Sequence, residues 1–483
     1  MQFNSIIFLL SLSVFIFLYF IVKNKQKKIL LLVCNLLFYL SFGIQGFIVL
    51  ISILAIIYIY GIVIEKSNHR KSFFISGVIS VLLFLVLFKY YNFFVSIFGN
   101  AGYLLPVVKL SAPIGLSFYT FSSLSYIIEI YRKRVPAEKS IFSLAQFITF
   151  FPIIVSGPIE RPYNLLPQFN EKKAFDYERI KGGLILITLG FFKKVVIADR
   201  LAVLVEKVFS NSTEYRGVAL LVGAVLFSIQ IYCDFSGYTD IAIGIAKVLG
   251  YKVTENFNLP YYSKSIKEFW TRWHITLSTW IRDYIFLPIA YSVTRKLKNK
   301  PFIGIKSEDW SYYIGISITM FVCGLWHGAN WTFIVWGLIH AFFLMFSFAT
   351  RKIRKKMLKK TGLEKSFISS YFKISFTFFL VTFAWIFFRA NNLNDAIYIV
   401  TNIFNNFNSV NVMRIFSSRL NMYIVTLLMI VLELIHFIQR KEGILVFLNK
   451  RPLWQRWGIY YFFVLVILIF GRFDVASFIY TKF

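Results

Sequence analysis

One short stretch, GLWHGANW at residues 324–331, places a residue able to move a proton inside an otherwise uncharged run. Between Asp309 and Arg351 the chain has no acidic or basic residue other than histidines. An imidazole can take and return a proton near neutral pH, and burial lowers the pKa of an imidazole, which keeps it available as a neutral base. His327 is therefore a candidate general base for a hydroxyl group that attacks an acyl carbon.

The flanking loops predict how deep His327 lies. Two crossings must fit between the basic loops at 294–300 and 351–360, whose composition is typical of cytoplasmic loops. Residues 311–326 span roughly 24 Å as a helix, which is less than the ~30 Å thickness of the hydrocarbon layer. We therefore expect His327 below the outer surface, at a helix break made by Gly328.

The residues beside His327 allow a functional and a simpler interpretation. Asn330 is expected to support the helix break. In the simpler interpretation, His327 only caps a broken helix by hydrogen-bonding a carbonyl group, and Trp326 and Trp331 are interface or packing residues. Intramembrane ionisable groups are functional by default, which favours the first interpretation.

His274 is the second candidate, within RWHITLSTWIRDY at residues 272–284. The charges of Arg272, Arg282 and Asp283 exclude a uniformly apolar helix. They favour a tilted or surface-lying element whose tryptophans face lipid or protein while its charges reach water. On that interpretation His274 is a structural hydrogen-bonding residue. The remaining histidines are interpreted as structural: His69, His340 and His436.

The composition indicates an all-α polytopic membrane protein. Hydrophobic residues make up 58% of the chain, and the mean hydropathy is +0.67. Apolar runs of the length that crosses a bilayer recur from end to end. The net charge of +31 comes largely from short basic clusters between these runs, which mark cytoplasmic loops and argue against nucleic-acid binding.

The order of apolar runs predicts one membrane domain over residues 1–483. The first run, 4–22, is interpreted as a retained span because it lacks the features of a signal peptide. The part that carries function is expected at about 140–350, where apolar runs are short and contain charges, prolines and glycines. The number of crossings is predicted to be ten or twelve. Three isolated cysteines in apolar surroundings predict neither disulfides nor a metal site.

Eight stretches give the chain a resemblance to the membrane-bound O-acyltransferase family, specifically to its bacterial branch that O-acetylates alginate and other polysaccharides. The pair formed by RWHITLSTW and, some fifty residues later, WHGANW is the most specific part of the match. The matching stretches are residues 112–132, 150–169, 190–202, 232–251, 255–289, 323–341, 383–390 and 478–483.

The resemblance implies a fold and an activity. The fold would be a ring of about ten to twelve transmembrane helices around a thin central funnel with broken or re-entrant helices. Within it, His327 would be the catalytic base and His274 a second essential residue. The acyl donor would be a cytoplasmic thioester, acetyl-CoA, with no bound cofactor and no metal. The substrate-binding residues expected around the funnel are Asp234, Arg272, Trp273, Asp283, Trp326 and Asn330.

The terminal stretch FIYTKF, residues 478–483, resembles a C-terminal tyrosine motif of the same family. By that resemblance, Tyr480 would accept the acyl group and pass it to an extracytoplasmic acyltransferase or esterase-like partner protein. The alternative is an aromatic anchor at the membrane interface.

The acceptor is left open by the sequence. The leading hypothesis is O-acetylation of an envelope polysaccharide or peptidoglycan by a multi-pass protein of the bacterial inner membrane, in contact with lipids. The alternatives are D-alanyl transfer to teichoic acid by the same mechanism, and a non-enzymatic transporter or flippase of a lipid-linked glycan.

Overall fold

The structure is a computed structural model that describes residues 3, 5–100, 106–108, 111–297, 300–301, 303–362, 366–405, 410–473 and 478–479. All regular elements of these residues are helices, as the composition predicts. The chain divides into two compact units, which are described separately. Unit 1 comprises residues 1–196, 234–254 and 442–483, and unit 2 comprises residues 197–233 and 255–441. The prediction of a single domain remains a prediction.

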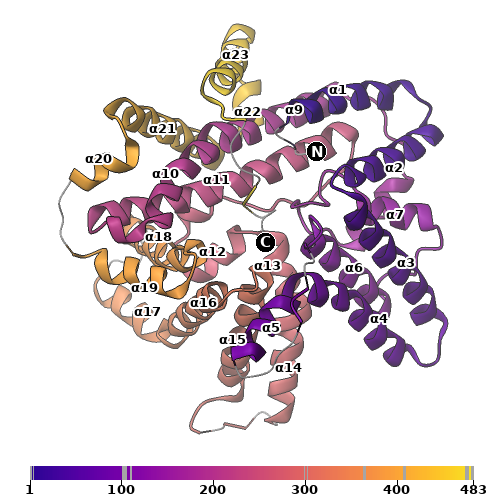
Figure 1. Ribbon diagram of the computed structural model, residues 1–483, viewed down its shortest axis with the longest axis horizontal. Coiled ribbons are helices and arrows are strands. Elements are labelled where there is room, and N and C mark those ends of the chain that lie inside the picture. Colours follow the sequence, from indigo (N-terminus) through magenta and orange to yellow (C-terminus); the bar gives the residue numbers. More distant parts are fainter. Residues whose placement is uncertain are drawn as a thin grey trace. The chain divides into compact units, whose positions relative to one another are not determined.

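The first part of unit 1 is a group of packed apolar helices. Figure 1 shows α3 (Ile44–Lys66), α4 (Arg70–Leu85) and α6 (Leu116–Tyr131) side by side. α1 (Ile6–Ile21) packs on α2 (Asn24–Leu40). α6 is buried along nearly its whole length, whereas α4 leaves many apolar side chains exposed. An exposed apolar surface of this extent is that of a helix facing lipid.

The second part of unit 1 brings two long elements together at glycines. α9 (Tyr177–Phe191) continues into the π-helix η3 (Phe192–Ala198) and packs on the part of α11 (Val218–Leu249) that belongs to unit 1. A Cβ on Gly190 would lie 2.6 Å from the backbone oxygen of Gly237. The contact therefore requires glycine, and it sets η3 directly against α11.

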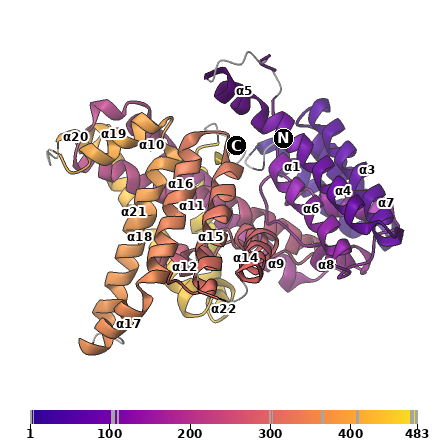
Figure 2. The same ribbon diagram turned by 90° about the horizontal axis from the view of Figure 1, so that it is seen from below.

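Unit 2 contains an antiparallel pair of helices joined at His327. α15 (Ser307–His327) packs on α16 (Trp331–Ala349), and α16 packs on α18 (Phe367–Arg389), as Figure 2 shows. A Cβ on Gly324 would lie 2.3 Å from the backbone oxygen of Phe333. Glycine at this position allows α15 and α16 to approach with their backbones nearly in contact.

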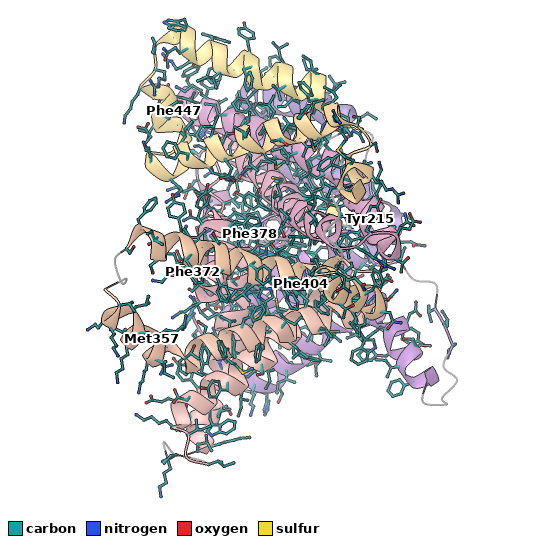
Figure 3. The ribbon with its side chains drawn as sticks, turned by 90° about the vertical axis from the view of Figure 1, so that its left-hand side faces the viewer. Tyr215, Met357, Phe372, Phe378, Phe404 and Phe447 are labelled. Atoms are coloured by element: carbon teal, nitrogen blue, oxygen red, sulfur yellow. The ribbon has the colours of Figure 1, made fainter. Side chains whose placement is uncertain are left out.

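The opposite face of α18 is apolar and exposed. Phe372 lies on this face and is 69% exposed, whereas Phe378, on the same helix in Figure 3, packs on Tyr261 at 5.2 Å. The basic helix α17 (Arg351–Lys360) has no buried residue. An apolar face ending beside a basic helix is typical of a lipid-facing helix that reaches the cytoplasmic surface.

The remaining helices complete the two units. They are η1 (Val86–Tyr90), α5 (Tyr91–Asn100), α7 (Ile141–Thr149), α8 (Pro162–Leu165), η2 (Pro167–Asn170), α10 (Asp199–Ser210), η4 (Ser212–Glu214), η5 (Pro260–Tyr262), α12 (Ile266–Arg272), α13 (Ile275–Ile281), η6 (Arg282–Phe286), α14 (Leu287–Lys296), α19 (Leu393–Asn402), α20 (Val410–Phe416), α21 (Arg419–Lys441), α22 (Ile444–Asn449) and α23 (Leu453–Phe470).

Within the described part of the chain, seven helices are long and apolar enough to cross a membrane. This identifies a multi-pass membrane protein. The sequence predicted ten or twelve crossings, and the difference arises from elements such as α1, which has 16 residues and falls short of a full span. The expected ring around a thin funnel remains a prediction.

Candidate functional site

His327 is the last residue of α15 and is 2% exposed. The following residue, Gly328, is extended with φ −174° and ψ 151°, so the helix ends here. A Cβ on Gly328 would lie 2.2 Å from the ring of Phe333. Glycine is therefore required for space rather than for an unusual backbone conformation. The helix break predicted at this position is confirmed.

Asn330 begins the next helix. Its side-chain oxygen accepts a hydrogen bond from the backbone N–H of Thr332 at 3.0 Å, the usual N-cap arrangement. Its amide nitrogen donates to the backbone oxygen of Asn391 at 3.3 Å. Asn330 thus supports the helix break, as predicted. Its role in substrate binding remains a prediction.

Aromatic rings surround the His327 imidazole. The ring centroid of His327 lies 4.7 Å from Trp326, 5.0 Å from Trp336 and 5.1 Å from Phe388. Trp336 in turn stacks on Trp385 at 5.6 Å. A wall of this composition keeps the local dielectric low and strengthens electrostatic interactions with any reacting group beside the imidazole.

His274 lies in the turn between α12 and α13. Its backbone has φ 42° and ψ 56°, a left-handed conformation that costs a non-glycine residue ~1–3 kcal/mol. Its side chain is completely buried. The tilted or surface-lying placement of the element, considered from the sequence, remains a prediction. The sharp turn directs the imidazole inward, while Arg272 and Arg282 on either side remain partly exposed.

Asn256 holds His274 in place, and sequence reasoning missed it. Its Oδ1 lies 3.2 Å from Nδ1 of His274, and it also accepts a hydrogen bond from the Thr276 hydroxyl at 2.7 Å. Because Oδ1 is an acceptor, Nδ1 of His274 is the donor in this bond. Burial lowers the pKa of His274 to about 3, so the imidazole is neutral at pH 7. No local pattern could have pointed to Asn256, which is separated from His274 by 18 positions.

The two histidines predicted from the sequence belong to one cluster. Trp326 contacts both, with ring centroids 6.1 Å from His274 and 4.7 Å from His327. We call the set His274, Trp326, His327, Trp336 and Phe388 the His327 cluster. It lies wholly within unit 2.

His340 extends the cluster on α16, although the sequence suggested only a structural role. It is completely buried and packs on Trp336 at 5.0 Å and Trp270 at 5.1 Å. Neither ring nitrogen has a hydrogen-bond partner among the described residues. The available signal was the spacing of four between Trp336 and His340, which places both on one face of a helix.

The other predicted substrate-binding residues lie in different surroundings. Trp273 is 1% exposed and packs on Trp385 at 5.0 Å, so it adjoins the cluster. Arg272 makes an ion pair with Glu268 at 2.8 Å, and Asp283 makes one with Arg282 at the same distance. Their predicted contacts with substrate remain predictions.

Two predicted residues belong to unit 1. Asp234 is buried and forms an ion pair with Lys194 at 2.5 Å. Its predicted contact with substrate remains a prediction. Tyr480, the predicted acyl relay, lies outside the described residues.

The described ranges contain no group of three or more histidine, cysteine or acidic side chains placed to hold an ion. The expectation that no metal takes part remains a prediction. Cys34, Cys233 and Cys323 form no disulfide with one another and are partly or fully buried, in line with their interpretation as packing residues.

Comparison with known proteins identifies relatives over most of the length. Residues 131–394 match the membrane-bound O-acyltransferase (MBOAT) family. The chain is 36% identical over 408 residues to a protein of Pseudomonas aeruginosa named probable alginate O-acetylase AlgI, covering 82% of this chain and 73% of the relative. It is 31% identical over 435 residues to the peptidoglycan O-acetyltransferase of Helicobacter pylori, covering 82% of this chain and 78% of the relative. A shorter match, 32% identical over 240 residues, covers 49% of this chain and 59% of the teichoic acid D-alanyltransferase of Bacillus subtilis.

Proposed function

The chain belongs to the membrane-bound O-acyltransferase family, and on that premise we propose that it transfers an acetyl group from acetyl-CoA to hydroxyl groups of an extracytoplasmic polysaccharide or peptidoglycan. His327 is the general base in this proposal. The proposed location is the bacterial inner membrane, where a cytoplasmic thioester and an external acceptor can reach the same protein.

The observation that carries the proposal is the position of His327. A buried imidazole at the break between α15 and α16, surrounded by aromatic rings, is well suited to accept a proton. In the reaction, the acceptor O–H bond breaks as its oxygen bonds to the acyl carbon, and the C–S bond of the thioester breaks. His327 takes the hydroxyl proton and returns it to the departing thiolate.

We propose that His274 helps to hold the His327 imidazole in position. Its neutral imidazole is held by Asn256 and contacts Trp326, which packs directly on His327. A fixed Trp326 ring restricts the orientations open to the His327 imidazole. A preorganised imidazole lowers the activation barrier because it does not have to reorient during the reaction.

Acetate is favoured over D-alanine as the transferred group. The acetylating relatives match 82% of this chain, whereas the D-alanyltransferase matches 49%. Mild alkali cleaves the esters of the cell-envelope polymer, and the acid that is released decides between the two, because acetate and D-alanine are readily distinguished. Release of D-alanine would select teichoic acid as the acceptor.

The final transfer is proposed to require a second protein with an extracytoplasmic acyltransferase or esterase-like domain. By family resemblance, Tyr480 carries the acetyl group to that partner as an ester on its phenolic oxygen. In this relay the Tyr480 phenol is the first hydroxyl to attack the thioester: its O–H proton passes through His327 to the departing CoA thiolate as the Tyr480 ester forms. A hydroxyl of the partner or the polymer later attacks that ester, and its proton goes to the departing Tyr480 oxygen, which restores the phenol.

Replacement of His327 tests the proposed function. His327→Ala should reduce polymer-bound acetate by a factor of about 100 or more, since general base catalysis contributes ~10²–10⁴ in rate. His69→Ala is the matched control, because His69 is exposed before α4 and lies outside the cluster. Normal acetylation by a His327→Ala protein present at the wild-type level would refute the base role.

A further inference from the structure

A buried ion pair in unit 1 touches the last described residues of the chain. Nζ of Lys194 lies 2.5 Å from Oδ1 of Asp234, and the two side chains are 1% and 4% exposed. The second carboxylate oxygen, Oδ2, accepts a hydrogen bond from the backbone N–H of Ile479 at 2.7 Å. One carboxylate therefore joins π-helix η3, helix α11 and the C-terminal segment.

The neighbouring side chain reinforces the contact. Phe478 is 2% exposed, and Nζ of Lys194 lies 4.2 Å from the centroid of its ring. The edge of this ring meets Tyr238 at 4.5 Å with an interplanar angle of 87°. Tyr238 also stacks on Phe3 at 4.8 Å. Phe478 is thus packed as a core residue, and both Phe478 and Phe3 lie against Tyr238.

The chain is tied to η3 at a second point just before this segment. The backbone N–H of Arg472 donates to the carbonyl of Val195 at 2.9 Å. Val195 directly follows Lys194 in η3, so residues 472 and 479 are both held at the same π-helix and its ion pair.

Burying the Lys194–Asp234 ion pair costs desolvation free energy. Taking two charges out of water is repaid only when their remaining hydrogen-bonding capacity is also satisfied. Here the backbone N–H of Ile479 supplies a donor to the carboxylate, and charge-assisted bonds of this kind are stronger than neutral ones. A packed pair of apolar residues would hold η3 against α11, but it could not bind a main-chain N–H.

We propose that Lys194 and Asp234 anchor the C-terminal segment and thereby position the residue that follows Ile479, Tyr480, for acyl transfer. We call Lys194, Asp234, Phe478 and Ile479 the tail anchor. The relay through Tyr480 rests on the proposed function, whereas the anchoring stands on the contacts of residues 478 and 479. Lys194 and Asp234 act here as positioning residues, with no part in the chemical step.

The anchoring is tested by the reactivity of a thiol at position 479. Ile479→Cys keeps the backbone N–H and is introduced into the full chain with Cys34, Cys233 and Cys323 replaced by serine or alanine. Labelling by a membrane-permeable maleimide should be slow with Asp234 intact and about tenfold faster or more with Asp234→Leu, which removes the acceptor. Asp234→Asn keeps a carbonyl acceptor, so its labelling rate should lie between the rates measured with Asp234 and with Asp234→Leu.

Asp240 provides a matched control on the same two elements. It pairs with Lys193 at 2.7 Å, one residue before Lys194, and its side chain is 19% exposed. Asp240→Asn should leave the labelling rate of the thiol at position 479 unchanged. The anchor would be overturned if the thiol at position 479 were labelled at the same rate with Asp234→Leu as with Asp234 intact. It would also be overturned if Asp240→Asn accelerated labelling as much as Asp234→Leu does. Phe478→Ala, which leaves the ion pair intact, should also accelerate labelling, and it replaces Asp234→Leu if that protein does not fold.

Acetylation measurements separate this inference from the proposed function. If both hold, Asp234→Asn and Tyr480→Phe each reduce polymer-bound acetate, and only Asp234→Asn exposes position 479. If the relay is wrong and the anchor right, Tyr480→Phe acetylates normally while Asp234→Leu still releases the segment. If the anchor is wrong, position 479 labels at one rate throughout, whatever His327→Ala does to acetylation.

Discussion

The His327 cluster and the tail anchor solve the problem of burying polar groups in opposite ways. In unit 2, imidazoles are enclosed by tryptophan and phenylalanine rings, and His274 is held neutral. In unit 1, a full positive and a full negative charge are buried together, with a backbone N–H bonded to the carboxylate. Burial thus keeps His274 uncharged among aromatic rings, whereas the Asp234 carboxylate is paired with Lys194 and accepts a hydrogen bond from Ile479.

The largest effect on stability is expected at the charged region. Lys194→Met leaves the Asp234 carboxylate buried without its cation, which should lower the free energy of unfolding by ~3–5 kcal/mol. Thermal unfolding of the detergent-purified protein, followed by tryptophan fluorescence, measures the change. The double variant Lys194→Met/Asp234→Leu should recover part of the loss, since no uncompensated charge remains. A single variant that unfolds at the wild-type temperature would show that the pair is not energetically important.

The helix break at His327 should be sensitive to one added methyl group. Gly328→Ala places a Cβ where the ring of Phe333 lies, 2.2 Å away, so the ring or the helix end must move. Overpacking of this kind costs ~1–3 kcal/mol, and we expect lower acetylation because His327 shifts with the helix end. Gly328→Ala combined with Phe333→Leu should restore part of the activity. Full activity in the single variant would mean that the helix end tolerates the methyl group.

The neutral region should depend on Asn256, a residue that the sequence analysis did not single out. Asn256→Ala removes the acceptor shared by His274 and Thr276, which should cost ~1–3 kcal/mol and reduce acetylation about tenfold. Asn258→Ala is the control, because Asn258 is exposed two positions away. Equal activities of the two variants, measured as acetate released from the polymer, would remove Asn256 from the positioning of His274.

The smallest effect is expected at a partly exposed ion pair. Glu268→Gln removes the partner of Arg272, and a pair with both side chains 31% exposed is worth ~0–1 kcal/mol. Stability should therefore barely change, in contrast with Lys194→Met. If Arg272 contacts substrate, as the family resemblance implies, Arg272→Gln raises the KM for the acceptor while Glu268→Gln does not. Equal KM values in both variants would limit Arg272 to the ion pair.

Much of the candidate site could be predicted because its signals are local in the chain. The break after His327 follows from a glycine next to a histidine within a run too short to cross the bilayer, and Asn330 is an ordinary N-cap residue. The approach of His274 to Trp326 could not be predicted this way. It depends on a left-handed turn at His274 and on Asn256, which become neighbours only when the chain folds back.

Contiguous residues are enough to identify an α-helical membrane protein of the O-acyltransferase family with a histidine at a helix break. Hydrophobic length, basic loops and short motifs are properties of neighbouring positions, so they can be read before folding. The binding of the C-terminal segment by Asp234, and the place of His274 among the aromatic rings around His327, became visible only in the folded chain. Burial, ring packing and pairing of charges depend on residues far apart in the chain, and no local pattern specifies them.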